Sequence, residues 1–242
     1  MVGQKSGNIK VSVAIPSFEY NGKGVRYLSH IFRTIKFQTI DEVEVVITDQ
    51  SIDDNIQKFC EDNIFDLNLI YKRDLVNRGD VAANTNLAMD MASGEIVKLM
   101  YMDDFFFTNT SLEQIYNSLK NSDKMWLVCG TNHTRDDGKT FDTNLIPRWN
   151  DDMLRTGYNT MSGVSVIAYK NKNMNVRWDS KTCMMLDIDF YYSMREMYGD
   201  CEYLRSICVS QRVNSDALSS ILTDEEVEKE LIYCRKKHGV VL

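Results

Sequence analysis

Short apolar runs alternate with amphipathic segments over the first hundred residues, and this alternation limits the fold more than any other feature. The runs are rich in Val and Ile, as strands are, and the intervening segments carry apolar residues at helical spacing. Crossovers of about 20 residues join successive strands in parallel. The pattern predicts an α/β fold with a mixed, mostly parallel sheet flanked by helices. Strands are expected at residues 9–15, 43–48, 67–71 and 96–102, and helices at 25–37, 52–59 (capped by Ser51) and 81–91.

The second half of the chain has a weaker pattern. Helices are expected at residues 111–119 and 185–198, and strands at 125–129, 164–169 and 203–209. Residues 132–159 are polar, and a loop of this length in a compact domain is usually a lid or a binding excursion. Thr223 and Glu226 form a capping box that opens a charged C-terminal helix. Because no repeat or linker composition divides the chain, a single domain over residues 1–242 is expected.

Composition narrows the classes of protein. A chain of 242 residues with 43% hydrophobic and 26% charged residues can bury a full core. The net charge of −7 argues against a generally basic surface that would bind nucleic acid. Six cysteines without a C-x-x-C pair are expected to be reduced thiols. The first ten residues do not resemble a signal peptide, and no apolar run is long enough for a membrane span. We therefore expect a cytoplasmic, soluble protein, although peripheral membrane contact would leave little trace in the sequence.

Two adjacent acids follow the apolar run 96–102. Ligands in open α/β sheets bind beyond the carboxyl ends of the strands, where Asp103 and Asp104 would lie. Carboxylates suit Mg²⁺ or Mn²⁺, which prefer oxygen ligands. The alternative is that the two acids form a turn or cap the helix that starts near Ser111. The pair alone does not decide between these interpretations.

Further short motifs occur at or near the predicted strand ends. They are Ala14-Ile15-Pro16-Ser17-Phe18, Ile47-Thr48-Asp49-Gln50-Ser51-Ile52-Asp53, Asn77-x-Gly79, Asn86, Ala92-x-Gly94-Glu95-Ile96, Met102-Asp103-Asp104 and Met185-Leu186-Asp187-x-Asp189-Phe190. In this order, over residues 9–190, they resemble the motifs of inverting glycosyltransferases of family 2. The resemblance implies a Rossmann-like domain of the GT-A type. It would consist of a nucleotide-binding half (9–107), an acceptor-side half (108–222) and a C-terminal helix (223–242).

The resemblance also implies an activity. The family's reaction is metal-dependent transfer of a sugar from a nucleotide-diphosphate donor, here with a UDP-sugar favoured, to an acceptor hydroxyl, in polysaccharide or glycoconjugate synthesis. Asp187 would be the catalytic base, and Asp104, with Asp103, would hold Mn²⁺ or Mg²⁺. The residues expected to bind the donor are Pro16, Ser17, Phe18, Asp49, Asn86 and Asp103.

Structural roles compete with several of these assignments. Asp49 could belong to a plain turn, Phe18 to the core, and Asp187 to a helix N-terminus that favours acids. Arg212 is a weaker candidate for a diphosphate contact. His238 is either a third metal ligand or, more simply, a cation at a helix C-terminus.

Some positions depart from the family pattern. Tyr101 and Leu186 stand where the family often has acids, Thr85 where it often has Arg, and Glu19 where it often has Asn. These departures support an alternative interpretation, in which the chain is a degenerate module that binds a nucleotide-sugar without transfer activity. A sugar-phosphate nucleotidyltransferase is a further alternative, but residues 17–24 contain only one lysine to cradle a triphosphate. The sequence does not identify the donor sugar, the acceptor, the linkage or the oligomeric state.

Overall fold

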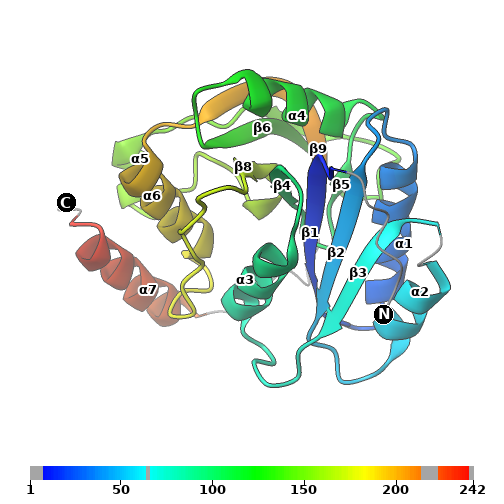
Figure 1. Cartoon of the computed structure of the whole chain (residues 1–242). Helices are drawn as coiled ribbons and strands as arrows, with labels where there is room; N and C mark the ends of the chain where they lie inside the picture. The colour runs from blue at the N-terminus through cyan, green and yellow to red at the C-terminus, as the bar shows by residue number, and fades with distance from the viewer. Residues whose placement is uncertain (1–7, 64–65, 214–222, 240–242) are drawn as a thin grey trace.

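A single mixed sheet organises the computed structural model, which describes residues 8–63, 66–213 and 223–239. The strand order is β3-β2-β1-β4-β8-β6-β9-β5, with β7 paired to β6 (Figure 1). The strands are β1 (Val11–Ser17), β2 (Val43–Asp49), β3 (Asn68–Arg73), β4 (Ile96–Leu99), β5 (Phe105–Phe106), β6 (Trp126–Thr134), β7 (Asp142–Leu145), β8 (Ile167–Lys170) and β9 (Glu202–Arg212).

Four strands of the first half run parallel. β1 pairs with β2 and β4, and β2 pairs with β3. Their carboxyl ends therefore share one edge of the sheet, where Ser17 lies opposite Asp49. β8 is antiparallel to β4 and β6, whereas β6 and β9 are parallel. The predicted mixed α/β sheet is confirmed, with its parallel part concentrated in the first half.

Seven α-helices in the described residues surround this sheet. α1 and α2 cover one face of β1–β3, and α3 lies on the other face (Figure 1). α1 buries five large residues at helical spacing, which explains its packing against the sheet. The helices are α1 (Gly24–Lys36), α2 (Asn55–Asn63), α3 (Val81–Met91), α4 (Ser111–Asn121), α5 (Asp151–Arg155), α6 (Leu186–Tyr198) and α7 (Asp224–Lys237).

Three predicted boundaries in the first half are wrong for identifiable reasons. The strand expected at residues 96–102 ends at Leu99, where the pairing of β4 with β1 stops. α2 begins at Asn55 rather than Ile52, because the Ser51 hydroxyl binds the Asp49 carboxylate instead of capping a helix. β1 continues past Pro16 to Ser17. Proline is tolerated there because the pairing with β4 ends two residues earlier, at Ala14.

The second half contains elements that the sequence pattern did not show. The expected loop 132–159 holds the end of β6, β7 and α5. The expected strand 164–169 begins with a 3-10 turn (Val164–Val166) before β8. At the C-terminal end, the capping box is confirmed: Thr223 and Glu226 bond reciprocally at the start of α7. Within residues 8–63, 66–213 and 223–239, no helix is both long and apolar enough to cross a lipid bilayer.

Candidate active site

The ends of β1 and β2 form one side of the candidate site. The Ser17 carbonyl accepts hydrogen bonds from the Gln50 N–H at 3.1 Å and from Asn84 Nδ2 at 3.0 Å. These bonds hold the tip of β1 against β2 and α3. The rim is therefore held by one backbone and one side-chain hydrogen bond within the protein.

Asp49 is fully buried at this rim. Its carboxylate accepts hydrogen bonds from the Ser51 N–H at 2.8 Å, the Tyr71 hydroxyl at 2.8 Å and the Ser51 hydroxyl. Burial, and then the bond to Asp49, raise the pKa of Tyr71 well above its usual value, so this phenol stays a donor. Asp49 thus has a structural role, and its contact with a nucleotide base stays a prediction.

Phe18 is only half-buried, which separates it from the core residues around it. The Arg78 guanidinium lies 5.7 Å from the centre of its ring. The backbone N–H of Phe18 donates to the Met102 sulfur at 3.4 Å, which ties Phe18 to the segment that carries Asp103. A half-buried aromatic ring next to Pro16 and Ser17 is suited to stacking on a base.

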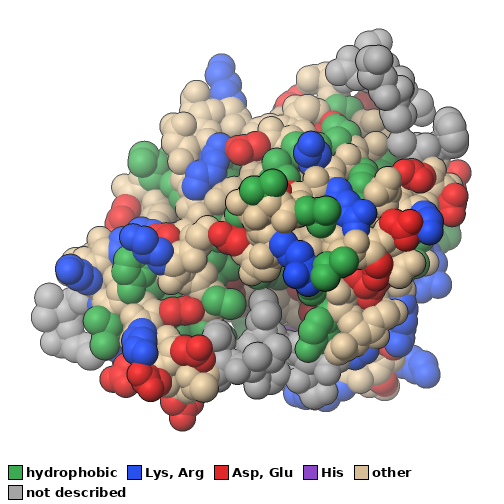
Figure 2. Space-filling model, turned by 90° about the horizontal axis from the view of Figure 1, so that it is seen from below, with side chains coloured by type: hydrophobic (Ala, Val, Ile, Leu, Met, Phe, Trp, Pro, Cys, Tyr) green, Lys and Arg blue, Asp and Glu red, His purple; other side chains and the backbone are tan. Residues whose placement is uncertain are grey.

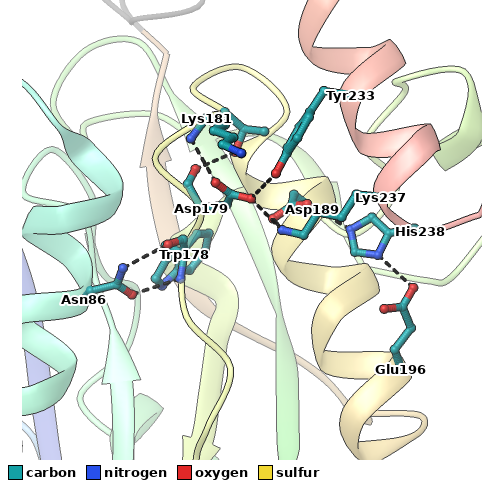
Figure 3. A network of polar contacts seen from close by, with 10 residues as sticks. Asn86, Trp178, Asp179, Lys181, Asp189, Glu196, Tyr233, Lys237 and His238 are labelled. Atoms are coloured by element: carbon teal, nitrogen blue, oxygen red, sulfur yellow. Dashed lines mark hydrogen bonds and ion pairs between the residues drawn. The ribbon is translucent and has the colours of Figure 1, made fainter.

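The Asn86 side chain has protein partners. Its Nδ2 donates to the Trp178 carbonyl and its Oδ1 accepts the Trp178 N–H, both at 2.9 Å (Figure 3). Its amide thus ties α3 to the segment before α6. A contact between Asn86 and the donor stays a prediction.

The two acids after β4 are held close to β9. Asp104 is 6% exposed, and its Oδ1 accepts the Arg212 N–H at 3.1 Å. Arg212 Nη1 also donates to the Asp103 carbonyl. Burial, and then the neighbouring charge of Asp103, raise the pKa of Asp104 to about 8. Burial also raises the pKa of Asp103.

The chemistry of this acid pair fits a hard divalent cation. Two adjacent carboxylates, Asp104 buried and Asp103 half-buried, repel each other when both are charged, and a cation would relieve that repulsion. In residues 8–63, 66–213 and 223–239, no group of three or more His, Cys, Asp or Glu side chains could hold a metal ion by itself. The remaining ligands would then be phosphate oxygens and water, as is common for Mg²⁺.

Arg212 compensates part of the acidic charge. Its guanidinium lies 4.9 Å from the Tyr27 ring centre and 4.8 Å from that of Phe105. It also bonds Asp137 at 3.0 Å and His30 Nδ1 at 2.6 Å. Burial, and then the charge of Arg212, lower the pKa of His30 to about 4, so His30 is neutral. Because its side chain is 6% exposed, Arg212 supports the acid pair from within the protein.

Asp187 lies in the first turn of α6. Burial raises the pKa of its carboxyl to about 7. Asn159 Nδ2 lies 3.4 Å from its Oδ2. Burial raises the pKa of Tyr101 most, and the negative charges of Asp187 and Asp103 add to this effect.

Gly163 connects the neighbourhood of Asp187 to that of Asp104. A Cβ atom on Gly163 would lie 2.8 Å from Gln211 Nε2 and 3.9 Å from Asp187 Oδ2. Gln211 directly precedes Arg212, whose N–H binds Asp104. A chain of contacts through Gly163, Gln211 and Arg212 therefore links the candidate base to the candidate metal ligand. Figure 2 shows the face on which β1–β3 end, where acidic and basic side chains are interspersed.

Sequence reasoning missed Ser165. Its hydroxyl accepts the Tyr101 N–H at 2.9 Å, and it lowers the pKa of Asp104 against the larger effect of burial. A buried serine inside the apolar run Val164-Ser165-Val166 was the available signal. His238 lies at the C-terminal end of α7, where its ring bonds Asp189 and Glu196, and this position fits the simpler interpretation.

Residues 12–183 match the family model "Glycosyl transferase family 2". A curated relative, Glycosyltransferase GlyG of Streptococcus pneumoniae serotype 4 (strain ATCC BAA-334 / TIGR4), is 24% identical over 113 residues, which are 47% of this chain and 36% of GlyG. The matched part thus spans about a third of that relative's length.

Two solved structures share the fold. S. aureus TarS 1-349 in complex with UDP-GlcNAc has a TM-score of 0.71 at 16% identity, over 93% of this chain and 66% of that one. Mannosyltransferase PcManGT from Pyrobaculum calidifontis, in complex with GDP-Man and Mn2+, has a TM-score of 0.65 at 17% identity, over 96% and 64%. The likeness shows the GT-A fold. Because the family model covers well over half of the chain, from β1 to the segment before α6, the chain belongs to glycosyltransferase family 2.

Proposed function

We propose that the chain is a metal-dependent, inverting glycosyltransferase that moves a sugar from a nucleotide-diphosphate donor to an acceptor hydroxyl. A UDP-sugar is the favoured donor, and polysaccharide or glycoconjugate synthesis is the favoured setting. The placement of Asp187 beside Gly163 and Gln211, next to the Arg212 N–H that binds Asp104, carries this proposal. Residues 9–107 would bind the donor, and residues 108–222 would form the acceptor side.

The donor site would use the rim of β1, β2 and β4. Phe18, with Pro16 and Ser17, would contact the base, and Asp49 would accept its imide N–H. Asp104 and Asp103 would hold Mn²⁺ or Mg²⁺ against the diphosphate. A bound divalent cation supplies Lewis-acid stabilisation of the charge that grows on the leaving diphosphate. TarS was solved with UDP-GlcNAc and PcManGT with GDP-Man and Mn2+, which supports a donor and a metal of this kind.

Asp187 would act as the general base. Its carboxylate would take the proton of the acceptor hydroxyl while that oxygen bonds to the anomeric carbon. The bond from this carbon to the diphosphate oxygen breaks on the opposite face, which inverts the configuration. A pKa of about 7 suits a base that works near neutral pH. The six unpaired cysteines support a cytoplasmic location.

The test is UDP or GDP release from a panel of UDP- and GDP-sugars, with Mn²⁺ and with Mg²⁺. Release from at least one donor, and an inverted anomeric centre in the NMR spectrum of the product, are expected. Absence of binding and turnover with every donor would contradict the proposal. Tight UDP binding without release or transfer would instead support the second candidate, a nucleotide-sugar-binding module. Tyr101 and Leu186 favour this candidate because they occupy positions where the family often has acids.

A further inference from the structure

A side chain of a distant helix caps the backbone that leads into α6, the helix that carries Asp187. Met185 is the N-cap residue, and its thioether is a poor cap. Instead, Glu230 Oε2 of α7 accepts the N–H groups of Cys183 at 2.9 Å, Met184 at 2.7 Å and Met185 at 2.9 Å. Backbone donors at a helix start favour an anion. Here the anion is the Glu230 carboxylate of α7, which lies 45 residues after Met185 in the sequence.

A second group of contacts fixes α7 against α6. Lys237 bonds both Asp179 and Asp189 at 2.8 Å, and the Tyr233 hydroxyl bonds Asp179 at 2.6 Å (Figure 3). His238 bonds Asp189 at 2.9 Å, on the body of α6. Figure 3 shows these side chains reaching from α7 to α6 and to the segment before it. α7 therefore holds α6 at its start and along its first turns.

We propose that Glu230 is a positioning residue for Asp187, which lies two residues beyond the last backbone N–H that Glu230 binds. The inference rests on the proposed function, because it gives Asp187 the role of the base. The family match ends at residue 183, so the cap comes from a helix outside the matched region. Glu230 itself contacts backbone groups and acts only through the segment that it holds.

Removing the carboxylate would leave three backbone donors without their acceptor. The first turn of α6 would then loosen, and the Asp187 carboxylate would move relative to the acceptor hydroxyl. A displacement of about 1 Å in a catalytic group can cost roughly 100-fold in rate. Asp104 and the ends of β1 and β2 would keep their contacts, because these come from other elements.

The experiment compares Glu230→Ala and Glu230→Gln with Glu228→Gln, an exposed carboxylate on the same helix. The assay is UDP release from UDP-GlcNAc with Mn²⁺, with UDP affinity measured by calorimetry. For Glu230→Ala we expect kcat to fall about 10- to 100-fold, while KM and the UDP Kd change less than about twofold. Glu230→Gln should lose less, because its amide oxygen still accepts hydrogen bonds. Glu228→Gln should match the unmodified chain.

A double variant shows whether the effect passes through Asp187. In the Asp187→Asn background, Glu230→Ala should cause little further loss of kcat, because the group that it positions is already gone. An independent further loss would overturn the inference, as would a normal kcat in Glu230→Ala. A matching loss of UDP affinity would also overturn it, since that result indicates general destabilisation.

Hydrogen exchange provides a readout that does not need activity. Amides of residues 183–187 should exchange faster in Glu230→Ala than in Glu228→Gln, and unchanged exchange would overturn the inference. If the unmodified chain releases no UDP from any donor, the proposed function fails, while the exchange measurement still decides whether Glu230 fixes the start of α6.

Discussion

Burial sets the protonation of Asp187. Asn159 Nδ2 lies close to its carboxylate. Burial, and then the charge of Asp187, raise the pKa values of Tyr101 and Tyr191, so both phenols stay neutral. With its pKa at about 7, the carboxyl is protonated below that pH and charged above it. Only the charged form can accept a proton. The activity of a neutral-pH enzyme would therefore depend directly on this one desolvated group.

The first prediction concerns the pH dependence of kcat. Because protonated Asp187 cannot act as a base, kcat should fall about tenfold per pH unit below about 7 and level off above it. Initial rates of UDP release across this range at saturating donor would measure it. A kcat that stays flat between about pH 5 and 8 would contradict the role of Asp187.

The second prediction separates catalysis from donor binding. Asp187→Asn should lower kcat by about 10²- to 10⁴-fold, the usual contribution of a general base, with the UDP Kd preserved. Asp152→Asn, which changes an exposed acid on α5, is the matched control and should have normal kinetics. If Asp187→Asn retained more than half of the activity, another group would have to be the base.

At the scale of elements, close contact at Gly94 sets β4 beside β1. The Gly94 N–H donates to Ser12 Oγ at 2.7 Å, and the Ser12 hydroxyl donates to Glu44 at 2.6 Å. A Cβ on Gly94 would lie 2.7 Å from the Ser12 backbone nitrogen. β4, which leads to Asp103 and Asp104, thus begins next to a position, Gly94, where the backbone of β1 leaves no space for a side chain.

The third prediction follows from this contact. Gly94→Ala should destabilise the fold by about 1–3 kcal/mol, because the added methyl group must push β4 away from β1. Urea denaturation followed by circular dichroism would measure the change in the free energy of unfolding. An unchanged midpoint would show that β4 can shift without loss of packing.

Local signals made some elements predictable. α3 covers the predicted residues 81–91, because Asp80 caps its start through the Ala83 N–H. β6 is longer than its apolar run, because pairing with β9 and β7 continues over polar residues such as Asn132 and Thr134. That pairing depends on partners far away in the sequence, which local patterns do not reveal. The same reason explains why the expected loop 132–159 contains regular structure.

In the candidate site, too, some features followed from local sequence signals and others depend on distant partners. The common edge of the parallel strands places Asp49, at the end of β2, and the segment that follows β4 at the same end of the sheet, as the strand pattern predicts. The partners of individual side chains did not follow, because they come from distant segments. Asn86 meets Trp178 across 92 positions, and Glu230 meets Met185 across 45. Such contacts exist only after the sheet and its outer helices have packed.

At the scale of the whole molecule, the site concentrates acidic charge in an already acidic protein. The chain has a net charge of −7, and burial raises the pKa values of both Asp103 and Asp104. Arg212 offsets part of this charge from β9. A bound cation would relieve the repulsion only in the folded chain, where the strands bring the two acids and Arg212 together.

The fourth prediction is therefore that Mn²⁺ and UDP together stabilise the whole fold. A ligand that binds only the folded state at 100 times its Kd adds about 2.7 kcal/mol. For a domain of this size, that corresponds to a rise in Tm of roughly 5–11 °C. Thermal melts with UDP and Mn²⁺, and with UDP and EDTA, would measure the part that depends on the metal. Asp104→Asn should abolish that part, whereas Asp152→Asn should keep it. An equal rise in Tm with EDTA would show that UDP binds without a cation, and Asp104 would then need a different role.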